Sequence, residues 1–182
     1  AVSRIPRVDR SVLFRLLTDG VNSVRTAGPL AIAVSAECWR EATLAIVDSV
    51  TGGVEPHIPA TPRVGVGTDR ASLLLSPHWD RLSIPHVFET MLKAPSQVFL
   101  FNVHGSPDVT DWFGDGGDGN MPHVFGPGLI ANYERAVVFS EACYGGAMGF
   151  DGLSVIEDFF LRGGTAFVGS SVIAYGSSSR QL

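Results

Sequence analysis

Two side chains in this sequence can act as a nucleophile and as a proton carrier, and each follows an apolar run. His104 comes directly after residues 98–103, and Cys143 lies four positions after the run 135–139. A thiol needs a nearby imidazole to favour the thiolate or to protonate a leaving amine, and folds usually assemble the pair from distant positions. We therefore expect covalent catalysis by His104 and Cys143. The alternative is an inert core cysteine, the commoner role after a strand.

Glycines accompany both of these side chains. Gly105 follows His104 directly, and Gly145 and Gly146 follow Cys143 closely. Because glycine leaves the main chain uncovered, the N–H groups of Gly105 and Cys143 could form an oxyanion hole for a substrate carbonyl. Either glycine cluster taken alone is explained as well by ordinary turns at the ends of strands.

The elements expected around these residues alternate between strands and helices. Strands are expected at 30–34, 98–103, 135–139 and 166–168, and helices at 35–50, 83–94, 153–162 and shortly after Asp9. Prolines interrupt residues 54–82, which are expected to be loops with one candidate strand at 63–66. This alternation predicts an α/β fold, with a mainly parallel sheet covered by helices on both faces. In such sheets functional groups gather outside the carboxyl ends of the strands.

The order of these motifs resembles that of the caspase-like (clan CD) cysteine peptidases, which include caspases, legumain, metacaspases, clostripain and gingipains. The shared motifs are a strand followed by His104 and Gly105, and a later strand followed by Glu141-Ala142-Cys143-Tyr-Gly-Gly. The stretch Ser3-Arg4-Ile5-Pro6 and residues 153–169 are similar to the gingipain family in particular.

The resemblance implies a caspase-like three-layer sandwich and the activity of a cysteine endopeptidase. In such an enzyme Cys143 would form a thioester with the substrate, and His104 would give a proton to the departing amine. One rival hypothesis is a catalytically idle caspase-like scaffold or interaction module in a larger protein. Another is a flavodoxin-like ligand-binding domain, which shares the layered architecture.

Glu141 is the candidate residue for substrate specificity. It lies two positions before Cys143, and the alternation of a strand would place both side chains on one side. In the resembling peptidases this position lines the primary pocket, and it is acidic in metacaspases and clostripain, which cut after Arg or Lys. The resemblance thus implies cleavage after a basic residue, by a charge-assisted contact with Glu141. A structural Glu bonded to backbone amides is the alternative, and Trp112 is either a pocket wall or core packing.

The chain is expected to form a single peptidase domain, residues 1–182, that is an excised or incomplete part of a larger protein. In gingipains a sizeable part of the catalytic domain precedes the segment that residues 3–6 resemble, and this sequence begins close to it. The expected partners are a protein or peptide substrate and the flanking domains or an activating partner. Residues 51–82 match no pattern of the family, so their role is open.

Composition excludes several other classes. A chain of 182 residues with 45% hydrophobic content can bury one core without disulfides or metals. The net charge of -5, without a basic stripe, argues against a nucleic-acid partner. No apolar run reaches the roughly 20 residues of a membrane-spanning helix, so we expect a soluble protein, whether exported or cytoplasmic. The context of Cys38, the second cysteine, is that of a core residue.

No cofactor is expected, although calcium is a candidate ligand. The loop 111–120 contains Gly-x-Gly-x-x-Gly, but it does not open a helix, and Asp115 and Asp118 would repel phosphates. Their oxygens could hold calcium, which gingipains bind, although the spacing is not that of an EF-hand and a solvated loop is the simpler reading. The histidines lack the spacing of a zinc hydrolase, and Gly-x-Ser-x-Gly is missing.

Overall fold

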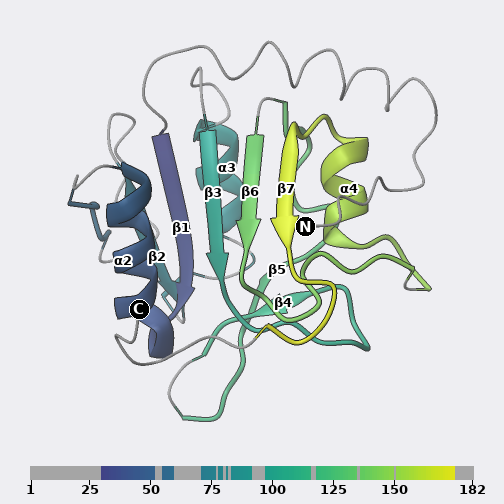
Figure 1. Cartoon of the computed structure of the whole chain (residues 1–182), viewed down its shortest axis with the longest axis horizontal. Helices are drawn as coiled ribbons and strands as arrows, with labels where there is room; N and C mark the ends of the chain where they lie inside the picture. The colour runs from purple at the N-terminus through teal and green to yellow at the C-terminus, as the bar shows by residue number, and fades with distance from the viewer. Residues whose placement is uncertain are drawn as a thin grey trace.

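Five parallel strands form the central sheet of the computed structural model, in the order β2-β1-β3-β6-β7 (Figure 1). The strands span Leu30–Ala36 (β1), Ser72–Ser76 (β2), Gln97–Asn102 (β3), Ala136–Ser140 (β6) and Ala166–Gly169 (β7). The structure describes residues 30–51, 55–59, 71–76, 78–79, 81, 83–91, 97–115, 118–134, 136–149 and 151–174. The α/β class and the mainly parallel sheet predicted from the sequence are confirmed.

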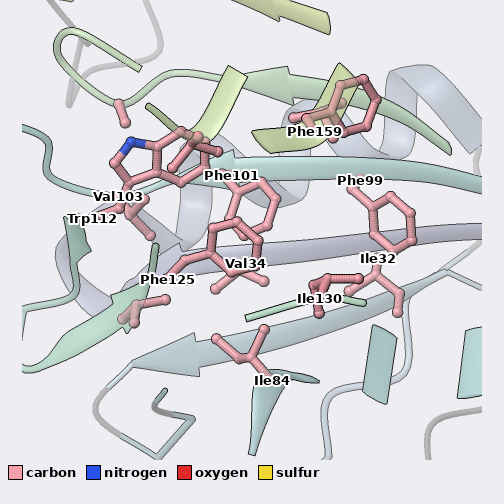
Figure 2. Close-up of a cluster of buried hydrophobic side chains, with 14 of the residues drawn as sticks. Ile32, Val34, Ile84, Phe99, Phe101, Val103, Trp112, Phe125, Ile130 and Phe159 are labelled. Atoms are coloured by element: carbon pink, nitrogen blue, oxygen red, sulfur yellow. The ribbon is translucent and has the colours of Figure 1, made fainter. Parts of the chain in front are cut away.

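Helices cover both faces of this sheet, and each face has its own apolar cluster. Helix α2 (Arg40–Thr51) lies on one face, where Val47 packs with Ala31, Ala33 and Leu100. Helices α3 (Ile84–Met91) and α4 (Val155–Leu161) pack on the other face, in the cluster drawn in Figure 2. Where both faces are covered, as over β1 and β3, the strands read as continuous apolar runs, whereas β6 alternates between buried and more exposed side chains.

The region of β1 and β2 differs from the sequence prediction in two ways. The helix expected at 35–50 begins later, because β1 continues to Ala36 and a 3-10 turn, Glu37–Trp39, separates it from α2. Ser35 and Ala36 stay in the strand because they pair with the end of β2. Strand β2 itself was expected to be loop. Its three leucines are too short a run to show a period, and it becomes a strand by pairing with β1.

A two-stranded antiparallel ribbon stands beyond the carboxyl end of β3. Its strands are β4 (Trp112–Phe113) and β5 (His123–Phe125). His104 and Phe113 exchange two main-chain hydrogen bonds of 2.8 Å, which tie the ribbon to the chain leaving β3. The rings of Trp112 and Phe125 pack on Phe101 of β3 (Figure 2). The glycine-rich loop is therefore attached to the end of β3 through both strands of the ribbon.

Helix α4 begins with a capping box. The Ser154 side chain accepts a hydrogen bond from the Glu157 N–H, and the Glu157 carboxylate accepts one from the Ser154 N–H. The helix predicted at 153–162 is thus observed with slightly shorter bounds. The predicted helix after Asp9, the candidate strand 63–66 and residues 3–6 lie outside the described residues.

Within the described part of the chain, no helix has the length and apolarity needed to cross a bilayer.

Candidate active site

The sheet places the ends of β3 and β6 side by side. Phe101 pairs with Ser140, and the Glu141 N–H donates to the Phe101 carbonyl at 2.8 Å, so the two chains leave the sheet together. Beyond this point Gly105 meets the main chain of Cys143. A Cβ built on Gly105 would collide with the Cys143 carbonyl oxygen. The segments that carry His104 and Cys143 are thus in contact, as expected from parallel strands that end at one edge.

A tight turn carries Cys143. The Gly145 N–H donates to the Ala142 carbonyl at 2.9 Å, which closes a four-residue turn with Cys143 and Tyr144 at its centre. Tyr144 has a φ of 57°, the left-handed conformation that a residue with a Cβ adopts at a cost of about 1–2 kcal/mol. Its N–H donates to the Val172 carbonyl at 2.9 Å, beyond β7. The turn is therefore a strained feature that the end of β7 holds in place.

The glycines after Cys143 serve packing. A Cβ on Gly146 would lie 2.6 Å from the carbonyl oxygen of Gly169, the last residue of β7. A Cβ on Gly145 would lie 2.5 Å from the Ser140 hydroxyl. These two positions require glycine because neighbouring backbone and side-chain atoms leave no room for a Cβ.

Two main-chain donors remain at the contact between the strand ends. Within the described part of the chain, the N–H groups of Gly105 and Cys143 donate to no protein acceptor. Main-chain donors without partners are uncommon away from water or ligand. Both are therefore available to a bound group.

Cys143 lines a small depression, and the hydrogen bond of its sulfur goes to a main-chain carbonyl. Sγ lies 3.6 Å from the Ala174 carbonyl oxygen, and the depression beside it measures about 10 Å³, room for little more than one water. Trp112 lines this depression, although it is only 3% exposed and belongs to the core (Figure 2). Trp112 thus combines the two roles considered from the sequence, packing in the core and forming a wall beside Cys143. The other lining residues are Ser106, Val109, Thr110, Tyr144, Gly145, Ala147, Ser154 and Val155.

The His104 ring is held on the α2 side of the sheet. Its centroid lies 4.4 Å from that of Trp39, and its Nε2 lies 3.7 Å from Asp115 Oδ2. Nε2 is buried, and no hydrogen bond joins it to any other described residue. Among the described residues, no hydrogen bond joins His104 to Cys143. The structure brings the two backbones together and turns the imidazole toward Trp39 and Asp115.

Glu141 is exposed and lines a different cavity from Cys143. This cavity, of about 250 Å³, lies between the sheet and α2, and its other walls are apolar: Ala31, Ile32, Ala33, Ile46, Val47, Val98, Leu100 and Phe139. The shared side expected for Glu141 and Cys143 is not observed, because β6 ends at Ser140 and the turn ends the alternation of the strand. Glu141 and the His104 ring are both on the α2 side.

Cys38 is the residue that the sequence reasoning misplaced. It was expected in the core, but it is exposed in the 3-10 turn Glu37–Trp39 that follows β1. Its sulfur, a nitrogen of His104 and an oxygen of Asp115 all lie within 4.8 Å of one another. Partial burial, a hydrogen bond to Asp115 and the charge of Asp115 raise the pKa of the Cys38 thiol to about 11. The sequence did contain one signal: Cys38 lies two positions after β1, whose carboxyl end is at the same edge of the sheet as that of β3.

The acidic loop does not gather its carboxylates. Asp115 faces His104 and Cys38, whereas Asp118 accepts a hydrogen bond from the Asn120 N–H and is exposed. Asp111 pairs with His123 at 3.0 Å. Among the described residues, Cys38, His104 and Asp115 form the one group of three that could hold a metal ion. The geometry favours a mixed sulfur, nitrogen and oxygen set over an all-oxygen calcium cage.

Comparisons of the chain with protein family models, curated proteins and solved structures gave no match. A function for this chain must therefore be inferred from the chemistry of its own residues.

Proposed function

We propose that the protein is a cysteine endopeptidase of the caspase-like type, with Cys143 as the nucleophile and His104 as the proton carrier. The observation that supports this most is the contact between Gly105 and the Cys143 main chain. It joins the ends of two neighbouring parallel strands, and among the described residues the N–H groups of Gly105 and Cys143 at this contact have no acceptor. A strained turn at the nucleophile, here at Tyr144, is a frequent companion of such sites.

In the proposed reaction the Cys143 thiolate attacks the carbonyl carbon of the peptide bond. The N–H groups of Gly105 and Cys143 stabilise the oxyanion, and each such donor is worth about 3–4 kcal/mol of barrier. The imidazolium of His104 protonates the amine as it leaves, and a thioester remains on the sulfur. Water, deprotonated by the same imidazole, then hydrolyses the thioester and restores the thiol.

This chemistry requires the His104 imidazole to approach the Cys143 sulfur. The ring rests on Trp39 and beside Asp115 and makes no hydrogen bond to Sγ. Catalytic hydrogen bonds are commonly loose in a free enzyme and tighten when substrate binds. In the proposal, the imidazole therefore turns from Asp115 toward Cys143 when the substrate is bound.

The two thiols at this edge of the sheet differ in their suitability as nucleophile. Cys38 has a pKa of about 11, so at neutral pH its thiol stays protonated and unreactive. Asp115 opposes the Cys38 thiolate because a carboxylate beside a sulfur disfavours a second negative charge. Cys143 lies beside the unpaired main-chain donors, which favours it as the nucleophile.

Cleavage after Arg or Lys is the proposed specificity. Glu141 supplies an exposed carboxylate at the carboxyl end of β6, beside an apolar cavity of about 250 Å³. A basic side chain has an apolar stem and a cationic head, so it matches apolar walls with one carboxylate. The proposed fold is the caspase-like three-layer sandwich, and the proposed partners are a protein or peptide substrate and the flanking or activating domains of a larger polypeptide.

The proposal is tested by labelling with an electrophile directed by Arg or Lys, such as a peptidyl acyloxymethyl ketone. We expect the adduct on Cys143, located by peptide mapping, and no adduct in Cys143→Ala or His104→Ala. The matched variant Cys38→Ala, which removes the other thiol, should still carry the adduct. Equal labelling of the intact protein and Cys143→Ala would disprove the assignment.

A second candidate function is an idle caspase-like module that binds partners without cleaving them. The direction of the imidazole, toward Trp39 and away from the sulfur, favours this alternative. The two functions differ in the rate of alkylation at neutral pH. A catalytic Cys143 reacts with iodoacetamide faster than the same residue in His104→Ala, whereas an idle Cys143 reacts at the same rate in both proteins.

A further inference from the structure

We propose that Cys38, His104 and Asp115 form a binding site for a divalent transition metal of the zinc type, and that the bound metal holds His104 away from Cys143. The binding site stands on its own geometry. The second half, inhibition, rests on the proposed peptidase function.

The topology of the sheet favours a ligand at this position. The chain proceeds from β1 to β2 on one side and then returns to place β3 on the other side of β1. Such a reversal opens a crevice outside the carboxyl ends of the two strands. Strands β1 and β3 end side by side (Figure 1). Cys38 follows β1, His104 follows β3, and the loop after β4 brings Asp115 to the same group.

The distances suit a metal with small adjustments. The three ligand atoms lie within 4.8 Å of one another, and His104 Nε2 lies 3.7 Å from Asp115 Oδ2. Two ligands of a tetrahedral zinc ion are roughly 3.2–3.7 Å apart, given bonds of about 2.0–2.3 Å. Nε2 is also a buried ring nitrogen that has no hydrogen bond among the described residues, and its ring packs beside Trp39. An ion between these atoms would satisfy this nitrogen.

The chemistry of the donors selects the class of metal. Thiolate, imidazole and carboxylate are zinc ligands, whereas calcium and magnesium prefer oxygen alone. With one thiolate and one carboxylate, the site balances the charge of a divalent ion. Three protein ligands also leave the fourth tetrahedral position open to water.

Binding requires the loss of one proton. The Cys38 thiol, with a pKa of about 11, is protonated in the free protein near neutral pH. When the metal forms its bond to Sγ, the S–H bond breaks and the proton passes to the buffer. No oxidant or reductant takes part.

The metal would act as a reversible inhibitor. His104 Nε2 would be engaged by the ion, so the imidazole could not turn to the Cys143 sulfur or carry its proton. Removal of the metal by a chelator would release His104. The site would thus couple the activity of Cys143 to the supply of zinc.

Cobalt(II) is the probe for the site, because a bond from thiolate to cobalt gives a near-ultraviolet charge-transfer band. We expect one cobalt per chain, with this band present in the intact protein and in Cys143→Ala. The band should disappear in Cys38→Ala, and the affinity for zinc, measured by competition with a chromogenic chelator, should fall at least tenfold in Asp115→Asn. Asp118→Asn, in the same loop, is the matched control and should bind as the intact protein does.

A band that persists in Cys38→Ala and disappears in Cys143→Ala would overturn the proposal, as would no binding at micromolar metal. Circular dichroism checks that each variant is folded, and Cys38 is exposed, so its replacement should leave the fold intact. For inhibition, labelling of Cys143 is compared with and without zinc in each variant. We expect zinc to slow labelling at least tenfold in the intact protein and to have no effect in Cys38→Ala. If Cys143 is never labelled, the peptidase proposal fails while the cobalt spectrum still decides the metal site.

Discussion

At the scale of single residues, the site is defined by two thiols that share one histidine. Cys143 lies on a strained turn whose main chain meets Gly105, and Cys38 lies beside the imidazole of His104 and the carboxylate of Asp115. In its observed position a ring nitrogen of His104 lies within 4.8 Å of the Cys38 sulfur. In the proposed peptidase, the direction of the His104 imidazole distinguishes an active site from an inactive one.

The reactivity of Cys38 should depend on pH and on Asp115. The pKa of the thiol is raised to about 11, so the thiolate is scarce at pH 8 and increases as the pH approaches 11. Asp115→Asn removes a negative charge and therefore lowers this pKa, which should speed alkylation of Cys38 by iodoacetamide several-fold at pH 8. Asp118→Asn is the control. An unchanged rate in Asp115→Asn, measured by mass spectrometry of the Cys38 peptide, would contradict the assigned contact.

Gly105 should not tolerate a side chain. In Gly105→Ala the new methyl group would collide with the Cys143 carbonyl, so the two strand ends must separate, at a cost of about 1–3 kcal/mol. We expect lower stability in chemical denaturation and the loss of Cys143 labelling. Gly152→Ala is the matched control, because a Cβ there meets nothing within 4 Å. Equal behaviour of the two variants would show that the contact is not rigid.

Glu141 should set the preference for basic substrates. A hydrogen bond between charged groups contributes about 1.5–3 kcal/mol, so Glu141→Gln should lower kcat/KM for Arg or Lys substrates about 10- to 100-fold. Substrates with a neutral residue before the cut bond should be affected much less. A uniform decrease for all substrates would show that Glu141 has no part in specificity.

At the scale of elements, the turns and caps at the sheet edge keep the site in place. The Cys143 turn is tied to the end of β7 by the N–H groups of Tyr144 and Gly146, and the ribbon β4–β5 is tied to the chain after β3. Helix α4 supplies Ser154 and Val155 to the depression beside Cys143. A substitution that shifts one of these elements should therefore also displace residues of the site.

The capping box of α4 provides a test at this scale. Ser154 is buried and accepts the Glu157 N–H, so Ser154→Ala should cost about 1–2 kcal/mol of stability. Because the same residue lines the depression, labelling of Cys143 should slow as well. Ser171→Ala, at an exposed position, is the control in urea unfolding. A loss of less than a few tenths of a kcal/mol would mean that the cap contributes little.

At the scale of the whole molecule, the aromatic cluster connects the sheet to the ribbon that carries the site. The ring centroid of Phe101 on β3 lies 5.0 Å from that of Trp112 and 4.8 Å from that of Phe125, one on each strand of the ribbon (Figure 2). Trp112 belongs both to the core and to the lining of the depression beside Cys143, so we expect a loss of core packing to disturb the site.

Phe101→Ala should reveal this coupling. Phe101 is 1% exposed, and truncation of a buried Phe costs about 3–5 kcal/mol. We expect a strong decrease in thermal stability together with the loss of Cys143 labelling. Phe139→Ala, the same substitution on a side chain that is 39% exposed, should cost much less. Similar losses in both variants would contradict the position assigned to the Phe101 ring.

The sequence by itself determined the class of the fold and the approximate elements that lead to the site. Long apolar runs predicted β1, β3 and β6, because the strands inside a parallel sheet bury most of their side chains. The parallel arrangement then followed from the alternation with helices. Because parallel strands end at the same edge of a sheet, this arrangement also predicted that His104 and Cys143 lie at one edge.

The tertiary structure alone decided what each side chain at that edge faces. Strand β2 exists because it pairs with β1, and no local pattern records that pairing. Cys38 joins His104 and Asp115 because three separate chain segments meet at the reversal of strand order. Glu141 and Cys143 separate because the strand ends one residue before the first of them, and side-chain direction cannot be extrapolated through a turn.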